Sequence, residues 1–183
     1  MFALIKIIFT DKLMKQIIQI FVLVFCLMTS SHAQFDDKDG WSGEQQAVYE
    51  TISTLFEGMR NGDKVLIESV FADQNRPLLK VITNDRDQDS AIQLRTAESF
   101  IQAAGQQHEK VWDERIWNTT ISIDGSLASV WTHYGFYLDN TLQHCGVNSI
   151  QLFKSSGMWK IINLAYTRKT TNCKIPERVQ NPK

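Results

Sequence analysis

The sequence predicts an α+β domain in which helices come first and a sheet of long antiparallel strands follows. Apolar residues recur at helical spacing soon after residue 42, and the last third of the chain consists of runs rich in β-branched and aromatic residues. With 43% hydrophobic and 21% charged residues among 183, the composition is that of a foldable globular protein. A formal net charge of -1 gives no electrostatic basis for binding nucleic acid or for polybasic attachment to a membrane surface.

The first 33 residues are predicted to be a secretory signal peptide. The uncharged apolar run Ile17–Met28 is shorter than the about 20 residues of a membrane-spanning helix and fits the roughly 7 to 15 of a signal-peptide hydrophobic region. Lys15 supplies positive charge before this run, and Ser31–Ala33 has the small-x-small form that precedes cleavage. We expect cleavage between Ala33 and Gln34, which makes the mature protein periplasmic or secreted, with no stable membrane anchor.

The segment 1–13 does not fit a signal peptide, because Asp11 is acidic and the segment adds a second apolar stretch before the positive charge. We therefore expect translation to begin at Met14. The residues that follow the cleavage site are acidic and contain glycine without periodicity, which indicates a flexible lead-in. The expected organisation is a signal peptide, a flexible lead-in, one domain and a C-terminal tail, at residues 1–33, 34–43, 44–173 and 174–183.

Three helices are expected before the long strands. The first begins at a capping-box pattern, Ser42 followed by Gln45, and ends at Asn61-Gly62. The second starts at Asp63, and the third follows the N-cap Thr96. The apolar residues of the first helix recur along one face: Val48, Ile52, Leu55, Phe56 and Met59.

The strand signals fall into two groups. Two short runs joined by a polar turn predict a hairpin, at residues 78–83 and 91–96. Four longer runs follow, at residues 115–123, 127–138, 144–154 and 159–169. Asp124-Gly125 and Ser156-Gly157 mark two of the junctions, so we expect an antiparallel meander.

Two histidines and an asparagine on neighbouring predicted strands form the most suggestive polar group. If Tyr137 lies opposite His144, then His133 lies opposite Asn148 on the same face of the sheet. Such a group can orient a ligand carbonyl or supply a neutral imidazole as a general base. In the alternative, this face is the solvated convex one and the face that carries Tyr134 meets the helices. A shift of one residue in the register exchanges the two interpretations.

Cys145 and Cys173 are the two cysteines that remain after the predicted cleavage. An even number of thiols in an exported protein suggests a disulfide, which would stabilise this fold by about 3.5 kcal/mol on the chain-entropy estimate. The alternative is one buried thiol and one thiol on a mobile tail.

Several segments carry a resemblance to a known superfamily: Val130-Trp131 with Tyr134 and Phe136, His144-Cys145-Gly146-Val147-Asn148, Gly157-Met158-Trp159-Lys160-Ile161, Thr167-Arg168 and Cys173. Over about residues 44–173 the chain resembles the nuclear transport factor 2-like superfamily, and more narrowly its exported bacterial SnoaL-like and lumazine-binding-like proteins. The resemblance implies a cone-shaped, curved antiparallel sheet wrapped around N-terminal helices, the cystatin-like α+β barrel. It implies no single activity, because the superfamily includes isomerases, dehydratases, epoxide hydrolases, polyketide cyclases and many binding proteins.

The enzymes of this superfamily suggest two kinds of catalytic residue. Ketosteroid isomerase-like chemistry needs a carboxylate base and a protonated acid beside a tyrosine in an apolar pocket. Here the acidic residues fall at predicted strand ends or turns, where carboxylates are ordinarily solvated: Asp113, Glu114, Asp124 and Asp139. Scytalone dehydratase-like chemistry uses histidines and tyrosines, for which His133, His144 and Tyr134 are the candidates.

We therefore expect an exported pocket protein that binds a small apolar or aromatic molecule and is not an enzyme; the alternative is an isomerase, dehydratase or cyclase. Aromatic and polar residues of the predicted strands are the ligand-binding candidates: Trp117, Asn118, Trp131, His133, Tyr134 and Asn148. No cofactor is expected, and no metal, because His133, His144 and Asp139 lack the short spacing of recognised ligand sets. The expected partner is the small molecule. A third interpretation of the function is an interaction module, in which a second copy of the chain binds through the sheet.

Overall fold

In the computed structural model of the chain, the described residues are 40–72, 78–83 and 91–181. The predicted signal peptide, the predicted start at Met14 and residues 34–39 of the predicted lead-in lie outside these ranges. Within the described ranges, no helix is both long enough and apolar enough to cross a membrane.

The helices and strands follow the order that the sequence predicts. The described helices are α2 (Gly43–Asn61), α3 (Lys64–Ser69), α4 (Ala97–Ala104) and α5 (Glu177–Gln180). The described strands are β1 (Leu78–Thr83), β2 (Ala91–Thr96), β3 (Trp112–Asp124), β4 (Leu127–Leu138), β5 (Thr141–Ser155) and β6 (Met158–Arg168). The predicted hairpin, the four-strand meander and the three helices before the meander are confirmed.

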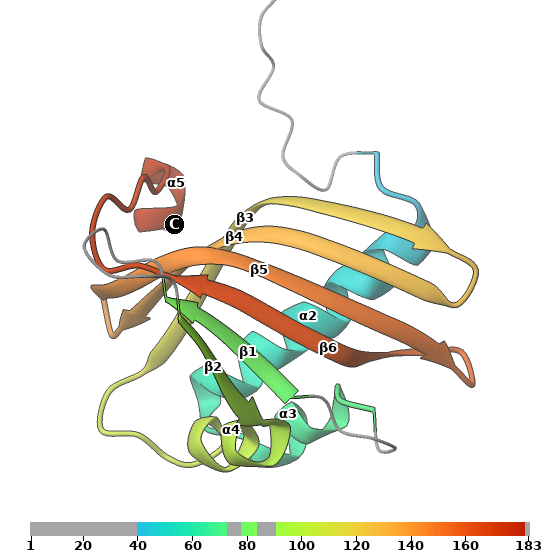
Figure 1. Cartoon of the computed structure of the whole chain (residues 1–183), viewed down its shortest axis with the longest axis horizontal. Coiled ribbons are helices and arrows are strands. Elements are labelled where there is room, and N and C mark those ends of the chain that lie inside the picture. The colour runs from blue at the N-terminus through green and yellow to red at the C-terminus, as the bar shows by residue number, and fades with distance from the viewer. Residues whose placement is uncertain (1–39, 73–77, 84–90, 182–183) are drawn as a thin grey trace, which may run out of the picture. The chain divides into compact units, whose positions relative to one another are not determined.

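The described strands form one curved sheet in the order β2-β1-β6-β5-β4-β3. Neighbouring strands are antiparallel except β1 and β6, which are parallel. The long strands pass in front of α2 in Figure 1, so α2 covers the far face of the sheet, and α3 and α4 lie near β1 and β2. We call the face toward α2 the inner face and the opposite face the outer face. The predicted α+β class is confirmed, although the sheet stays open, with β2 and β3 as its edges.

The helix starts show why these segments are helical. In α2, the Gln45 N–H donates to Ser42 Oγ (3.3 Å) and the Ser42 N–H donates to Gln45 Oε1 (3.0 Å), which completes the predicted capping box. Gly62 ends the helix with φ at 60°, a left-handed conformation that glycine adopts without strain. Asp63 and Thr96 cap α3 and α4, each accepting a backbone N–H through its side chain.

The core lies between α2 and the inner face of the sheet. It is formed by apolar residues that are buried on both elements: Val48, Ile52, Leu55, Phe56, Met59, Val130, Ile150, Leu152 and Ile161. Near the start of α2, the Glu44 carboxylate accepts Trp159 Nε1 (3.2 Å) and pairs with Lys154 Nζ (2.6 Å). The core is therefore closed at this end, and the open space described below begins along the C-terminal half of α2.

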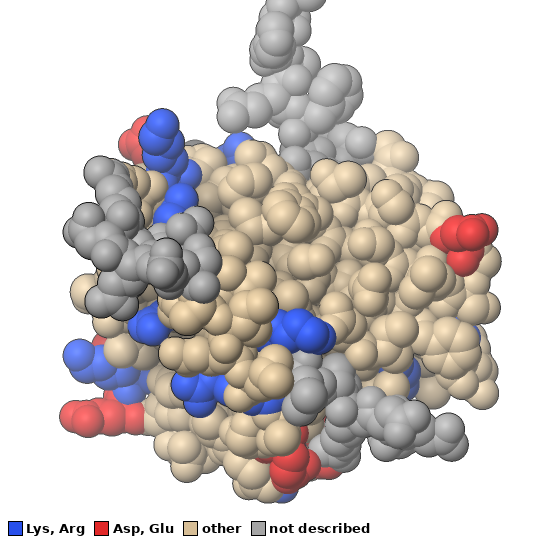
Figure 2. Space-filling model, viewed as in Figure 1, with Lys and Arg blue, Asp and Glu red and all other residues tan. Residues whose placement is uncertain are grey.

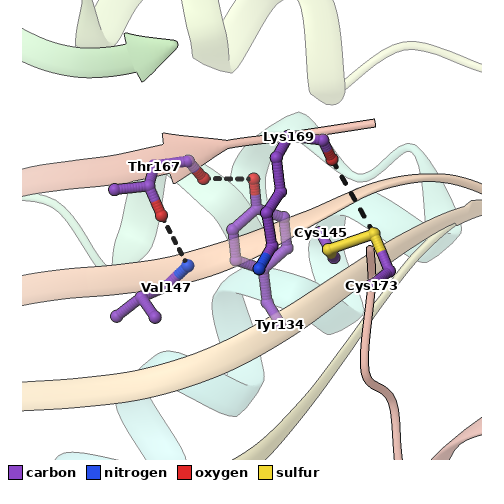
Figure 3. The surroundings of a disulfide bond; sticks show 6 residues. All are labelled: Tyr134, Cys145, Val147, Thr167, Lys169 and Cys173. Carbon is purple, nitrogen blue, oxygen red and sulfur yellow. Dashed lines mark hydrogen bonds between the residues drawn. A yellow bond between two sulfur atoms is a disulfide. The ribbon is translucent and has the colours of Figure 1, made fainter. Parts of the chain in front are cut away.

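A disulfide joins Cys145 of β5 to Cys173 beyond the end of β6 (Figure 3). The predicted pairing is thus confirmed, and the alternative of two free thiols is excluded in this structure. The segment that follows Cys173, predicted as a tail, contains α5 and buries Ile175 and Val179 in a second apolar cluster on the outer face with Trp117.

Arg115 of β3 holds α5 against this cluster. Its Nη1 donates to the carbonyl oxygens of Gln180 (2.6 Å) and Val179 (3.3 Å). Its guanidinium lies 4.1 Å from the centroid of the Tyr137 ring, and its Nε pairs with Asp113 (2.6 Å). A cation at the carbonyl end of a helix is the favourable arrangement, so the position of α5 is fixed electrostatically as well as by burial.

Gly146 lets β5 and β6 approach closely. A Cβ atom at this position would overlap the carbonyl oxygen of Thr167. Opposite Gly146 on β4 stands Tyr134, whose hydroxyl donates to that same carbonyl (2.9 Å; Figure 3). The Val147 N–H donates to Thr167 Oγ1 (3.0 Å). One glycine, one tyrosine and one threonine thus fasten three strands in a single register.

Candidate ligand-binding cavity

A cavity of about 360 Å³ lies between the inner face of the sheet and the helices α2 and α4. Its walls are mostly apolar: Leu55, Phe56, Met59, Leu79, Val81, Phe100, Trp112, Phe136 and Leu164. Its larger polar side chains come from the strands: Gln93, Arg95, Glu114, Tyr134, His144, Asn148, Tyr166 and Arg168. An apolar hollow of a few hundred Å³ with a few polar groups is the usual form of a small-molecule site.

The pairing of β4 with β5 decides which strand residues reach the cavity. Thr132 pairs with Asn148, and Phe136 pairs with His144. Residues opposite one another share a face, so His144 and Asn148 join Tyr134 on the inner face. All three line the cavity.

The β4–β5 register considered in the sequence-based prediction is wrong by one residue. It had Tyr137 opposite His144 and His133 opposite Asn148. Instead, the pairing shifts just before Tyr137, and His133 pairs with Val147. The expected group of two histidines and one asparagine is therefore divided: His133 belongs to the outer face, whereas the other two belong to the cavity.

The remaining predicted ligand-binding residues lie on the outer face. Trp117, Asn118 and His133 line a separate cleft of about 760 Å³ beside the disulfide, where the Trp117 and His133 rings stack with centroids 5.8 Å apart. Asn118 sits in a bulge with φ at 50°, where the β3–β4 register shifts. Trp131 is 54% exposed. None of these four residues contributes to the cavity.

Glu114 supplies a carboxyl group to the cavity, although we had predicted from the sequence that it lies at a solvated strand end. Strand β3 begins at Trp112, earlier than expected, so Glu114 lies within the strand on the inner face. Asn148 Nδ2 donates to its Oε1 (2.7 Å). Burial raises the pKa of Glu114 to about 7, against the lowering effect of the Asn148 hydrogen bond, and the charge of Asp113 adds to the rise. The expectation of a solvated carboxylate is wrong for this residue.

His144 is held in its neutral form. Burial, and after it the positive charge of Arg168, lower its pKa to about 4. The rings of Tyr134 and Phe136 flank the imidazole, with centroids at 5.7 and 4.9 Å. Its Nδ1 is buried without a hydrogen-bond partner among the described residues. A ligand group that supplies this bond would remove the cost of leaving a buried polar atom unpaired.

Tyr134 has a structural role that limits its chemistry. Its hydroxyl is engaged by the Thr167 carbonyl, and burial raises its pKa, with the charge of Glu114 adding to the rise. Tyr166 packs edge-to-face against it (6.1 Å between centroids), and its pKa is likewise raised by burial. Both phenols therefore stay protonated near neutral pH.

The polar end of the cavity therefore consists of a carboxyl group that titrates near neutral pH, an amide and a neutral imidazole. These groups can hydrogen-bond a ligand, and the carboxyl group can exchange a proton near neutral pH. Across the described ranges, no three His, Cys, Asp or Glu side chains gather closely enough to hold a metal ion.

Comparison with known proteins identifies the fold. No protein-family model and no curated protein matches the chain. A nuclear transport factor 2 (NTF2)-like protein from Cytophaga hutchinsonii superposes with a TM-score of 0.55 at 15% identity, covering 70% of this chain and 100% of that one. An NTF2-like protein with a cystatin-like fold from Novosphingobium aromaticivorans gives 0.54 at 9% identity, covering 70% and 83%.

A third similar structure is the proposed β subunit of an aromatic-ring-hydroxylating dioxygenase from Novosphingobium aromaticivorans. Its TM-score is 0.55 at 12% identity, covering 70% of this chain and 91% of that one. At such identities the likeness concerns the fold alone. The described domain has the NTF2-like, cystatin-like fold, which confirms the fold that the resemblance implies.

The two buried titratable groups should give the stability of the protein opposite pH dependences. For Glu114, the folded-state pKa of about 7 exceeds the ordinary 4.5, so its stabilising contribution is complete below pH 4.5 and is lost as the pH rises through 7. Relative to Glu114→Gln, the wild-type free energy of unfolding should fall by up to about 3 kcal/mol over that interval, as measured by urea denaturation at a series of pH values.

His144→Asn is the matched control, because the folded-state pKa of His144, about 4, lies below the ordinary 6.5. As the pH falls from 6.5 toward 4, His144 takes up a proton more readily in the unfolded chain than in the folded protein, which destabilises wild type. His144→Asn should therefore gain stability relative to wild type toward acid pH. Wild-type and Glu114→Gln curves that run parallel from pH 4.5 to 7 would contradict the assignment of Glu114.

Proposed function

We propose that the protein is an exported binding protein whose ligand, a small apolar or aromatic molecule, occupies the cavity. The observation that carries this proposal is the hollow of about 360 Å³ with mostly apolar walls and a few polar groups, among them Glu114, Asn148 and His144. Protein interiors are otherwise close-packed, so a hollow of this size beside a solid core is consistent with a binding site.

Export is part of the proposal. It rests on the predicted signal peptide, residues 1–33 with cleavage near Ala33/Gln34, and it agrees with the Cys145–Cys173 disulfide, since such bonds persist in oxidising compartments. The narrower resemblance to the exported SnoaL-like and lumazine-binding-like proteins fits the same proposal, with the ligand-binding domain at residues 44–173.

Blocking the cavity should weaken binding of an uncharged aromatic probe. Ala103 lines the cavity from the exposed side of α4, so Ala103→Trp would fill its opening without disturbing the core. In a fluorescence titration with N-phenyl-1-naphthylamine, wild type should bind one molecule, and Ala103→Trp should bind at least about tenfold more weakly.

The control is Gln102→Trp, which places the same ring on the neighbouring residue, outside the cavity lining. This variant should bind the probe as wild type does. Equal binding by all three proteins, or none by wild type, would rule out the cavity as the site.

A second candidate function, a proton-transfer enzyme of the isomerase, dehydratase or cyclase type, is favoured by one observation. Glu114 titrates near neutral pH and His144 has a strongly lowered pKa, and such perturbed groups cluster at functional sites. Of the sequence candidates, His144 lines the cavity, the Tyr134 hydroxyl is engaged, and His133 lies outside. The general base in this alternative is therefore Glu114.

An activated base in the cavity can be detected with 5-nitrobenzisoxazole, a small aromatic molecule. A base takes its C3 proton, the C–H electron pair forms the nitrile, and the N–O bond breaks to give 2-cyano-4-nitrophenolate. If the enzyme alternative holds, the rate should rise with pH through about 7, and Glu114→Gln should lower it about 100-fold. His133→Asn should leave it unchanged. A rate no greater than that of free acetate would favour the binding protein.

A second copy of the chain is the proposed macromolecular partner, bound through the outer face. Leu127, Trp131 and Phe153 project from this face, with exposed fractions of 50%, 54% and 46%. Figure 2 shows few charged side chains over the described part of this face. Exposed apolar patches of this kind mark interaction surfaces.

Sedimentation velocity tests this interface. We expect wild type to sediment as a dimer at micromolar concentrations and Trp131→Glu to sediment as a monomer, because a buried unpaired charge opposes association. Val65→Glu is the matched control, since Val65 is 76% exposed on α3, away from the sheet. It should remain dimeric. A monomeric wild type would refute the interface.

A further inference from the structure

We propose that the ligand is an amphipathic anion: an aromatic or otherwise apolar body bearing a carboxylate that pairs with Arg168 at the cavity wall. This inference rests on the proposed binding function and assigns to it a ligand class. Three features of the cavity lead to it: a cation without a partner, a polar atom without a partner, and the absence of an opposing charge.

The cation is Arg168, at the end of β6. Tyr166 pairs with Asn148 on the inner face, and Arg168 follows two residues later on the same face, so it lines the cavity. Among the described residues, its guanidinium has neither an ion-pair partner nor a hydrogen-bond partner. Its charge nevertheless acts in the cavity, since it helps to lower the pKa of His144. A guanidinium in this position is suited to bind a carboxylate through two hydrogen bonds.

The unpaired polar atom is Nδ1 of His144, which is buried without a partner among the described residues. A neutral imidazole carries one N–H donor, which can sit on this nitrogen. A carboxylate held by Arg168 can accept from it, so one anionic group would satisfy both residues. Binding of an anion would also oppose the effect of Arg168 and raise the pKa of His144.

The described residues that line the cavity carry little negative charge against such a ligand at pH 6. Glu114 is the only carboxyl group among the described lining residues, whereas Arg95 and Arg168 supply two positive charges. Because burial raises the pKa of Glu114 to about 7, its carboxyl group is mostly protonated at pH 6. The apolar walls would enclose the body of the ligand, and their aromatic residues, Phe56, Phe100 and Phe136, suit a planar ring.

Glu114 titrates near pH 7, and charged and titratable groups face it from two sides. On the cavity side these are Tyr134, His144, Tyr166, Arg95 and Arg168; the tyrosine pKa values are raised and that of His144 is about 4. Behind Glu114, in a second cleft, are Glu57, Arg60, Arg115 and Arg178. The neighbouring Asp113 is paired with Arg60 and Arg115.

The test compares 2-naphthoate with the uncharged 2-naphthamide, which has the same ring system and nearly the same size. By calorimetry at pH 6 with the mature chain, wild type should bind 2-naphthoate at least about tenfold more tightly than 2-naphthamide. Arg168→Met should abolish this preference. Lys169→Met is the matched control, because it removes the same charge from the adjacent residue, whose side chain lines the outer cleft. It should keep the preference.

The pH dependence gives an independent readout. As the pH rises from 6 to 8, Glu114 ionises and repels the carboxylate, so wild-type affinity for 2-naphthoate should fall severalfold. Glu114→Gln should show no such fall, and 2-naphthamide affinity should stay constant in both proteins.

Two kinds of failure can be told apart. If wild type and Arg168→Met both bind the two naphthalene probes equally, and Ala103→Trp weakens that binding, the anion inference is wrong while the binding function stands. If neither naphthalene probe nor N-phenyl-1-naphthylamine binds wild type, the binding function and the inference fall together.

Discussion

The pairing register between β4 and β5 is the constraint on which the site depends. With Thr132 opposite Asn148 and Phe136 opposite His144, an amide and an imidazole enter the cavity; a shift of one residue would send both to the outer face. The register is supported at Gly146, where β5 lies so close to the Thr167 carbonyl of β6 that no larger residue fits, and where Tyr134 of β4 donates to that same carbonyl. A backbone contact thus determines the chemistry of the site.

The cavity combines groups that are usually charged with surroundings that disfavour charge. Burial acts in the same sense on Glu114 and His144, favouring the neutral form of each, although it raises one pKa and lowers the other. Asn148 provides a hydrogen bond to Glu114, whereas His144 keeps one buried nitrogen unpaired among the described residues. The unpaired nitrogen of His144 and the nearby guanidinium of Arg168 together favour a ligand that supplies a hydrogen-bond acceptor and a negative charge.

Local sequence signals predicted most of the fold. The caps at Ser42, Asp63 and Thr96 and the alternating strands depend on neighbours in the chain, and so does the order of the meander. The parallel pairing of β1 with β6 was not predicted, because it joins segments distant in sequence. Helix α5 was missed as well, since it is too short to show periodicity and depends on Arg115.

The site was predicted less well than the fold, for a physical reason. The pairing of β4 with β5 shifts by one residue between Phe136 and Tyr137, and the alternation of residues along the two strands does not show where such a shift falls. Glu114 was missed because its strand was expected to begin one residue after it. The alternation of Trp112, Glu114 and Ile116 is the signal that could have shown an inward-facing carboxyl group.

Cross-strand nuclear Overhauser effects in the isotope-labelled mature protein test the central claim most directly, because backbone protons of paired residues in antiparallel strands lie within reach of one another. The structure requires contacts that join Asn148 to Thr132 and His144 to Phe136. Contacts that join Asn148 to His133 and His144 to Tyr137 instead would move the imidazole and the amide out of the cavity and contradict the account.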